Sequence, residues 1–94
     1  MVRKKFYVIC YDIEENGART KVSDFLTNFG RRANFSVFEC MVTDSQFQLI
    51  KEGINKLIDH DTDSILVYRI CADCYTKTDH FGKVLPVEGG PYFI

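Results

Sequence analysis

A single acidic residue ends an apolar run near the start of the chain. In "KKFYVICYDIEENG" (residues 4–17), six consecutive apolar or aromatic residues lead into Asp12 and then into a polar, glycine-containing turn. An acid at such a position is commonly a turn or cap residue. The alternative is chemistry, because Mg²⁺ prefers oxygen ligands and takes one or two protein carboxylates beside phosphate oxygens. A metal held there would lower the pKa of bound water and stabilise charge on a phosphodiester.

No other catalytic set competes with Asp12 in this sequence. Glu14 and Glu15 are either outer metal ligands or exposed turn acids. Both histidines, His60 and His80, stand in polar loops without a paired serine, and the turn at Gly17 lacks the G-x-x-x-x-G-K phosphate loop. One acid per chain is therefore half a site, which a second copy would complete.

The four cysteines fall into two pairs with different surroundings. Cys10 and Cys40 lie inside apolar strand-like runs, where packing in the core is expected. Cys71 and Cys74 form C-x-x-C, which is half a zinc site with His80 as the nearest nitrogen ligand. Structural zinc, redox chemistry and ordinary loop thiols remain open for this pair.

Three strand-like and two helical segments would position these residues. Residues 5–12 and 64–70 read as strands that are apolar on both faces, and residues 31–42 as one long strand or a tight hairpin. Residues 18–29 predict a helix with an apolar stripe, ended by a cap at Gly30. Thr43 and Gln46 predict a capping box that opens a second helix, which "DHDTD" (59–63) breaks. A short strand is also predicted near His80.

This order predicts an α+β domain of the ferredoxin-like β-α-β-β-α-β type. Two helices can cover only one face of such a sheet, yet the first and last strands are apolar on both faces. With 94 residues, the domain is small, and 46% of them are hydrophobic. We therefore expect a second copy to cover the other face in a two-fold homodimer.

Charge and hydropathy limit the partners. The net charge is −1, which argues mildly against binding through phosphates alone. Seven of the twelve basic residues nevertheless lie in the first third of the chain: Arg3, Lys4, Lys5, Arg19, Lys21, Arg31 and Arg32. No apolar run approaches the length of a membrane span or a signal peptide, so we expect a cytoplasmic protein without a membrane partner.

The motifs "YVICYDI", "GRRANFSVFECMVTDSQF" and "DSILVYRICADC" closely resemble the small CRISPR-associated endoribonuclease family (Cas two), the second core CRISPR adaptation protein. The resemblance covers roughly residues 5–75. It implies a ferredoxin-like domain at 1–80 with residues 31–42 as two strands. It also implies a homodimer with facing sheets, and a tail at 81–94 that adds a strand to the partner's sheet.

The same resemblance implies an activity and a set of site residues. Family members are described as Mg²⁺-dependent nucleases acting on single-stranded RNA or double-stranded DNA, and as the bridge of the CRISPR integrase (Cas one) complex that inserts spacers. Asp12 matches the metal-binding acid. Tyr11 and Phe38 match aromatic positions associated with activity, and Arg19 and Arg32 match basic positions expected to touch phosphate.

Two further cations are candidate phosphate contacts, and this sequence departs from the family pattern at one of them. Arg31 adjoins Arg32, and Lys21 stands where the family commonly has Arg. Lys neutralises a phosphate but does not bind it through two parallel hydrogen bonds.

The sequence leaves three functions open. They are a metal-dependent phosphodiesterase, a non-catalytic DNA scaffold that bridges integrase dimers, and a toxin-like ribonuclease of similar architecture.

Overall fold

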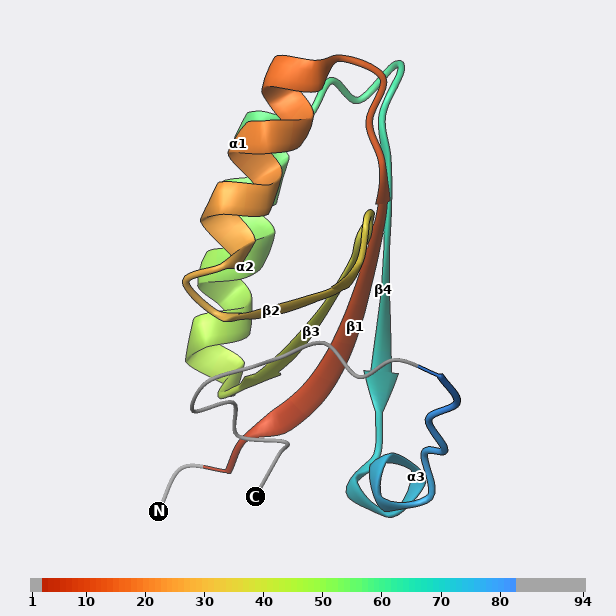
Figure 1. Ribbon diagram of the computed structural model, residues 1–94. Helices are drawn as coiled ribbons and strands as arrows, with labels where there is room; N and C mark the ends of the chain where they lie inside the picture. The colour runs from red at the N-terminus through yellow and green to blue at the C-terminus, as the bar shows by residue number, and fades with distance from the viewer. Residues whose placement is uncertain (1–2, 83–94) are drawn as a thin grey trace.

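The computed structural model describes residues 3–82 (Figure 1). The elements follow in the order β1 (Lys5–Asp12), α1 (Asn16–Leu26), β2 (Gly30–Asn34), β3 (Val37–Val42), α2 (Asp44–Leu57), β4 (Ser64–Ile70) and α3 (Ala72–Thr76). This order confirms the predicted α+β class with ferredoxin-like topology, and α3 is an addition to it. The predicted tail lies, apart from its first two residues, outside the described residues.

The sheet is antiparallel, with strand order β2-β3-β1-β4. The central strand β1 pairs with β3, where Ile9 lies opposite Phe38, and with β4, where Asp12 lies opposite Ser64. Opposite residues in such pairs share a face and successive residues alternate. Asp12 therefore belongs to the same face as Val8 and Cys10.

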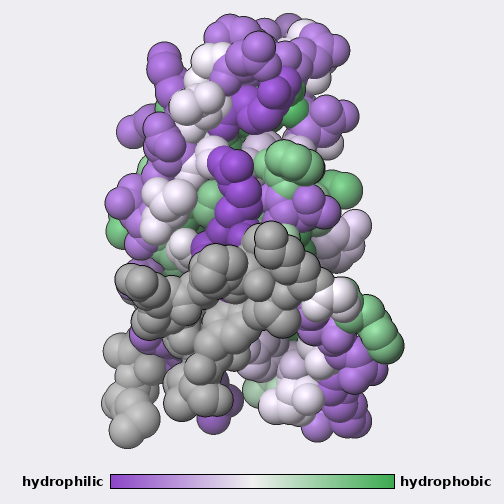
Figure 2. Space-filling model, viewed as in Figure 1, coloured by the Kyte–Doolittle hydropathy of each residue, from purple (hydrophilic) through white to green (hydrophobic). Residues whose placement is uncertain are grey.

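The helices α1 and α2 lie side by side on one face of the sheet (Figure 1). The core forms between them and that face, and it is held together by residues that bury nearly all of their surface: Tyr7, Ile9, Tyr11, Val22, Leu26, Phe38, Cys40, Val42, Ile50 and Ile54. Figure 2 shows hydrophilic residues over the outer side of α1. The predicted apolar stripes therefore face the sheet.

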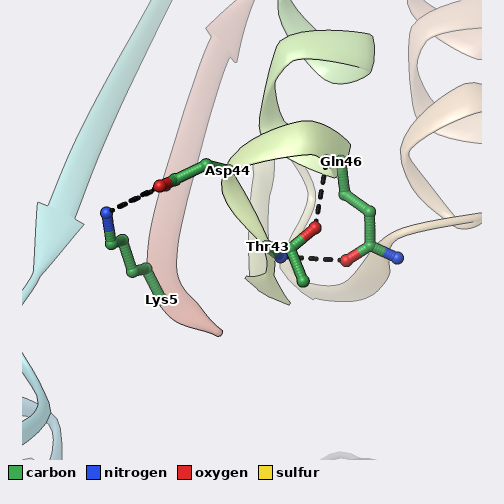
Figure 3. Close-up of polar contacts among 4 residues, drawn as sticks. All are labelled: Lys5, Thr43, Asp44 and Gln46. Atoms are coloured by element: carbon green, nitrogen blue, oxygen red, sulfur yellow. Dashed lines mark hydrogen bonds and ion pairs between the residues drawn. The ribbon is translucent and has the colours of Figure 1, made fainter. Parts of the chain in front are cut away.

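Helix α2 begins with the predicted capping box (Figure 3). The Thr43 hydroxyl accepts from the Gln46 N–H at 3.2 Å, and the Gln46 side chain accepts from the Thr43 N–H at 2.9 Å. The Lys5 ammonium lies 2.9 Å from the Asp44 carboxylate, which ties β1 to this helix start. Inside α2, a Cβ on Gly53 would lie 2.1 Å from Phe25 Cζ, so close packing of α1 on α2 explains the glycine.

Three local predictions differ from the structure. Helix α1 starts at Asn16 and ends at Leu26, so the predicted range 18–29 was displaced towards the C-terminus. Gly30 opens β2 and is no helix cap: a Cβ there would lie 2.1 Å from the Glu39 carbonyl oxygen, and this close strand contact requires glycine. The strand predicted near His80 was wrong, since residues 71–82 hold α3 and no strand.

The other face of the sheet has little cover within residues 3–82. On that face Leu66 is 56% and Tyr68 53% exposed, whereas Phe6 is buried under Tyr75 of α3, with ring centroids 4.5 Å apart. This confirms the expectation that α1 and α2 cover one face only. None of the helices in the described part of the chain is long and apolar enough to cross a bilayer.

Candidate functional site

Asp12 lies at the rim of a cavity of about 640 Å³ between the end of β1, helix α1 and the β2–β3 turn. Its side chain is exposed, and its carboxylate accepts no hydrogen bond from residues 3–82. Arg19, Ser23 and Arg32 also line this cavity, with a second acid, Asp24. An acid that serves as a turn or cap would bond nearby backbone N–H groups, so Asp12 has no such local role here.

Tyr11 and Phe38 fix the position of Asp12 from within the core. Tyr11 is 4% exposed and Phe38 is fully buried, with their ring centroids 6.2 Å apart. The Tyr11 N–H donates to the Ser36 carbonyl at 3.0 Å, and its hydroxyl donates to the Phe35 carbonyl at 3.1 Å. Their burial prevents contact with a substrate in this conformation, so both act as positioning residues.

Arg19 anchors the loop that follows Asp12. Its Nε and one terminal nitrogen donate to the Ile13 carbonyl at 3.1 and 3.0 Å. The same terminal nitrogen donates to the Glu14 carbonyl at 3.2 Å, and the other donates to Asn16 Oδ1 at 2.8 Å. Since a guanidinium has five N–H donors, most of them are engaged within the protein. A phosphate would have to compete with the loop for this side chain.

Arg32 is the more available cation in the cavity. One terminal nitrogen donates to the Ser23 hydroxyl, and the guanidinium carbon lies 5.9 Å from the centroid of the Phe38 ring. No other partner for it occurs within the described range, and the residue is exposed. Ser23 was missed from the sequence, although its i, i+4 spacing from Arg19 places both on one side of α1.

The other two predicted phosphate contacts lie away from this cavity. Lys21 is exposed on α1 and does not line it. Arg31 belongs to the face of the sheet turned away from α1 and α2, because its partner Glu39 lies opposite Val8. Asp12 belongs to the same face, but Arg31 is two strands away, does not line the cavity, and has its Nε 3.3 Å from Glu39 Oε1. The structure therefore brings Asp12, Arg19 and Arg32 together but separates Lys21 and Arg31 from them.

A metal at Asp12 would need ligands from outside residues 3–82. Within residues 3–82, no three His, Cys, Asp or Glu side chains gather as a metal site. Glu14 and Glu15 line a different depression, beside the end of α2. The exposed Asp12 carboxylate suits Mg²⁺ when a second carboxylate or phosphate oxygens complete the shell.

The cysteines lie away from Asp12's cavity. Cys40 is buried in the core, and burial, reinforced by the charge of Glu39, raises its pKa to about 12. Cys71 and Cys74 are exposed, and the Cys74 N–H donates to Cys71 Sγ at 3.3 Å. No zinc cluster forms around them among the residues described.

Comparisons with known proteins agree with this fold. The family model described as "CRISPR associated protein Cas2" matches residues 5–78. A CRISPR-associated endoribonuclease Cas2 of Synechocystis is 34% identical over 82% of this chain and 84% of its own length.

Two solved structures are similar as well. Streptococcus pyogenes Cas2 superposes with a TM-score of 0.74 and 28% identity, over 82% of this chain and 99% of its own. A chain of a partial Cas6-RT-Cas1–Cas2 complex superposes with a TM-score of 0.68 and 26% identity, over 81% and 89% of the two chains. The match to the family model covers well over half of the sequence, and the chain belongs to the Cas2 family of CRISPR-associated proteins.

Proposed function

We propose that the chain is a CRISPR adaptation protein that hydrolyses phosphodiesters of RNA or DNA as a Mg²⁺-dependent homodimer. The observation that carries this is the Asp12 carboxylate, exposed and without a hydrogen bond from residues 3–82, in one cavity with the available cation of Arg32. Near Asp12, the buried Tyr11 side chain holds the end of β1, and the Arg19 guanidinium holds the loop that follows it. The nuclease names of relatives support this class of activity.

The bare sheet face supplies the argument for a second copy. Asp12, Cys10 and Val8 share that face with the exposed Leu66 and Tyr68. Packing two such faces about a two-fold axis brings the same face of each β1, including Asp12, towards its copy. Two carboxylates brought together repel each other unless they share a proton or a cation.

Asp12 of each subunit would hold the metal, which supplies an activated water and stabilises charge on the phosphodiester. Arg32 would bind and orient a phosphate with the donors that Ser23 leaves free. Arg19 keeps the loop from Ile13 to Asn16 in place. In this proposal, Asp12 binds the metal, Arg32 binds the phosphate, and Arg19 holds the loop.

A non-catalytic scaffold is the second candidate, and two observations favour it. The described residues of a single chain form no three-ligand metal cluster, and a structurally similar chain belongs to a complex that contains Cas1. In that role the homodimer would hold duplex DNA and bridge Cas1 integrase dimers during spacer insertion. Phosphate contacts would still make its DNA binding fall steeply with salt.

Cleavage assays on single-stranded RNA and double-stranded DNA, with and without Mg²⁺, test the enzymatic proposal. Asp12→Asn keeps the size of the side chain and removes its charge, and Glu14→Gln is the matched control at an exposed acid of a different depression. We expect Mg²⁺-dependent cleavage that Asp12→Asn abolishes and Glu14→Gln retains. Equal cleavage by Asp12→Asn would exclude the mechanism.

Cleavage by the purified chain and spacer acquisition in cells together separate the two candidates. The scaffold alone predicts that Asp12→Asn supports normal acquisition and that purified chain cleaves neither nucleic acid. The enzyme predicts cleavage by the purified dimer, whatever the acquisition result. Loss of acquisition in a folded Asp12→Asn dimer would contradict a scaffold-only role.

A further inference from the structure

An exposed dithiol lies at the opposite end of β1 from Asp12. Cys71 follows β4 directly, and Cys74 lies in the helical turn behind it. Both side chains are exposed, and the turn brings the Cys74 N–H to 3.3 Å from Cys71 Sγ. The C-x-x-C turn thus places two accessible thiols next to each other, and they have no part in the proposed nuclease site.

Cys71 also lines a cavity of about 360 Å³ with a strongly basic rim. The cations that line it are Arg3, Lys4, Lys5 and Arg69, and none of its lining residues is acidic. Lys5 is paired with Asp44, and the charge of Arg69 also acts on this carboxylate, whereas Arg3 and Lys4 form no ion pair with any residue from 3 to 82. The rings of Phe6 and Tyr75 contribute apolar surface. Such a cavity suits a small molecule that carries carboxylates and an apolar or sulfur-containing centre.

We propose that Cys71 and Cys74 form a redox-active site that exchanges with a low-molecular-weight disulfide bearing carboxylates, bound in this basic cavity. The cavity supplies the binding energy for the carboxylates, and Cys71, the thiol in its lining, is the attacking group. Cys74 lies within reach to resolve the intermediate. Zinc has no comparable support, since no third ligand joins the pair in the described range.

The hydrogen bonds between the two cysteines shift the pKa values of their thiols in opposite directions. The thiol and the backbone N–H of Cys74 lower the pKa of Cys71, whereas the interaction with Cys71 raises the pKa of Cys74. Because the thiolate is the nucleophile, Cys71 reacts first and Cys74 resolves. Cys40 is buried with its pKa raised to about 12, which makes it inert.

The exchange balances without any further oxidant. The Cys71 thiolate attacks one sulfur of the small disulfide, which forms a mixed disulfide and releases one small thiolate. Cys74 then loses its proton and attacks Cys71 Sγ, which forms the Cys71–Cys74 disulfide and releases the second thiolate. Two protein thiols are oxidised, one small disulfide is reduced, and the protons end on the two small thiols.

The test compares oxidised glutathione with cystamine, an anionic and a cationic disulfide, on the reduced full-length chain. Remaining thiols are alkylated and located by peptide mass spectrometry. We expect a Cys71–Cys74 disulfide that forms about tenfold faster with oxidised glutathione at low salt, with the preference shrinking as salt rises. Cys74→Ser should accumulate the mixed disulfide on Cys71.

Charge variants locate the binding step. Arg69→Gln should reduce the preference for oxidised glutathione, and Lys56→Gln, at an exposed cation outside the cavity, should leave it unchanged. Equal rates with the two disulfides, or first modification at Cys10 or Cys74, would overturn the proposal. Nucleic acid cleavage plays no part in these measurements, so their outcome is independent of the proposed nuclease.

Discussion

Replacing Arg19 by Gln distinguishes an arginine that holds the loop from one that binds phosphate. The structure commits its guanidinium to the Ile13 and Glu14 carbonyls and to the Asn16 side chain. Gln keeps much of the aliphatic part of the side chain but has one amide group in place of the guanidinium. We expect Arg19→Gln to lower stability and to leave the salt dependence of nucleic acid binding nearly unchanged.

The magnitude follows from the hydrogen bonds that Gln cannot replace. Arg19 makes four contacts of 2.8–3.2 Å, and a single amide can remake one or two of them. A typical net contribution is about 0.5–1.5 kcal/mol for each bond, and this side chain is exposed, so we expect a loss of about 1–2 kcal/mol. For a domain of this size, the melting temperature falls by roughly 4–8 °C for each kcal/mol.

Arg32→Gln is the matched comparison for the Arg19 variant. This substitution removes only the hydrogen bond from the Arg32 guanidinium to Ser23 and its contact with the Phe38 ring. We expect a loss of at most about 1 kcal/mol from these contacts. If Arg32 neutralises one duplex phosphate, the slope of log affinity against log salt falls by about 0.9. Urea unfolding and binding at several salt concentrations measure both quantities. A reduced slope with unchanged stability for Arg19→Gln would refute the anchoring role.

Three further predictions concern the scaffold of the site. Thr43→Ala should cost about 1 kcal/mol in urea unfolding by removing the cap of α2, and an unchanged midpoint would contradict the capping role. Tyr68→Glu should convert a dimer into a monomer in light scattering, because it places charge on the bare face; a stable dimer would place the interface elsewhere. The hydrogen bond from Lys5 lowers the pKa of Asp44 from 3.8, so the stabilisation is present above that value and lost as pH falls through the folded pKa. The stability difference between wild type and Asp44→Asn should therefore close below pH 3.8, and a constant difference would argue against this pair.

Strong periodicity made much of the fold predictable. Continuous apolar runs predicted the strands at 5–12 and 64–70. The capping box predicted the start of α2. The hairpin within 31–42 did not follow from pattern alone, because Phe35 and Ser36 join β2 to β3 without a typical turn dipeptide, and a register shift lies between Arg32 and Asn34. The family resemblance, and not the periodicity, predicted two strands there.

The site was predictable in its residue types but not in its grouping. Sequence alone could not show which of the adjacent Arg31 and Arg32 faces the helices, because this depends on the register of β2 against β3. It could not show that the Arg19 donors are engaged with loop carbonyls, because these contacts come from backbone that no motif marks. The role of Cys71 likewise depends on α3, a helix of five residues that is too short for a periodic signal.

The central claim is that one Asp12 from each of two subunits holds a shared cation. Mixing wild-type and Asp12→Asn chains by unfolding and refolding, and measuring Mg²⁺-dependent cleavage against composition, tests it directly. A shared site predicts that an equal mixture retains about one quarter of the wild-type activity, because only dimers with two wild-type chains are active. Activity of about one half would show that each subunit cleaves alone and would contradict the shared site.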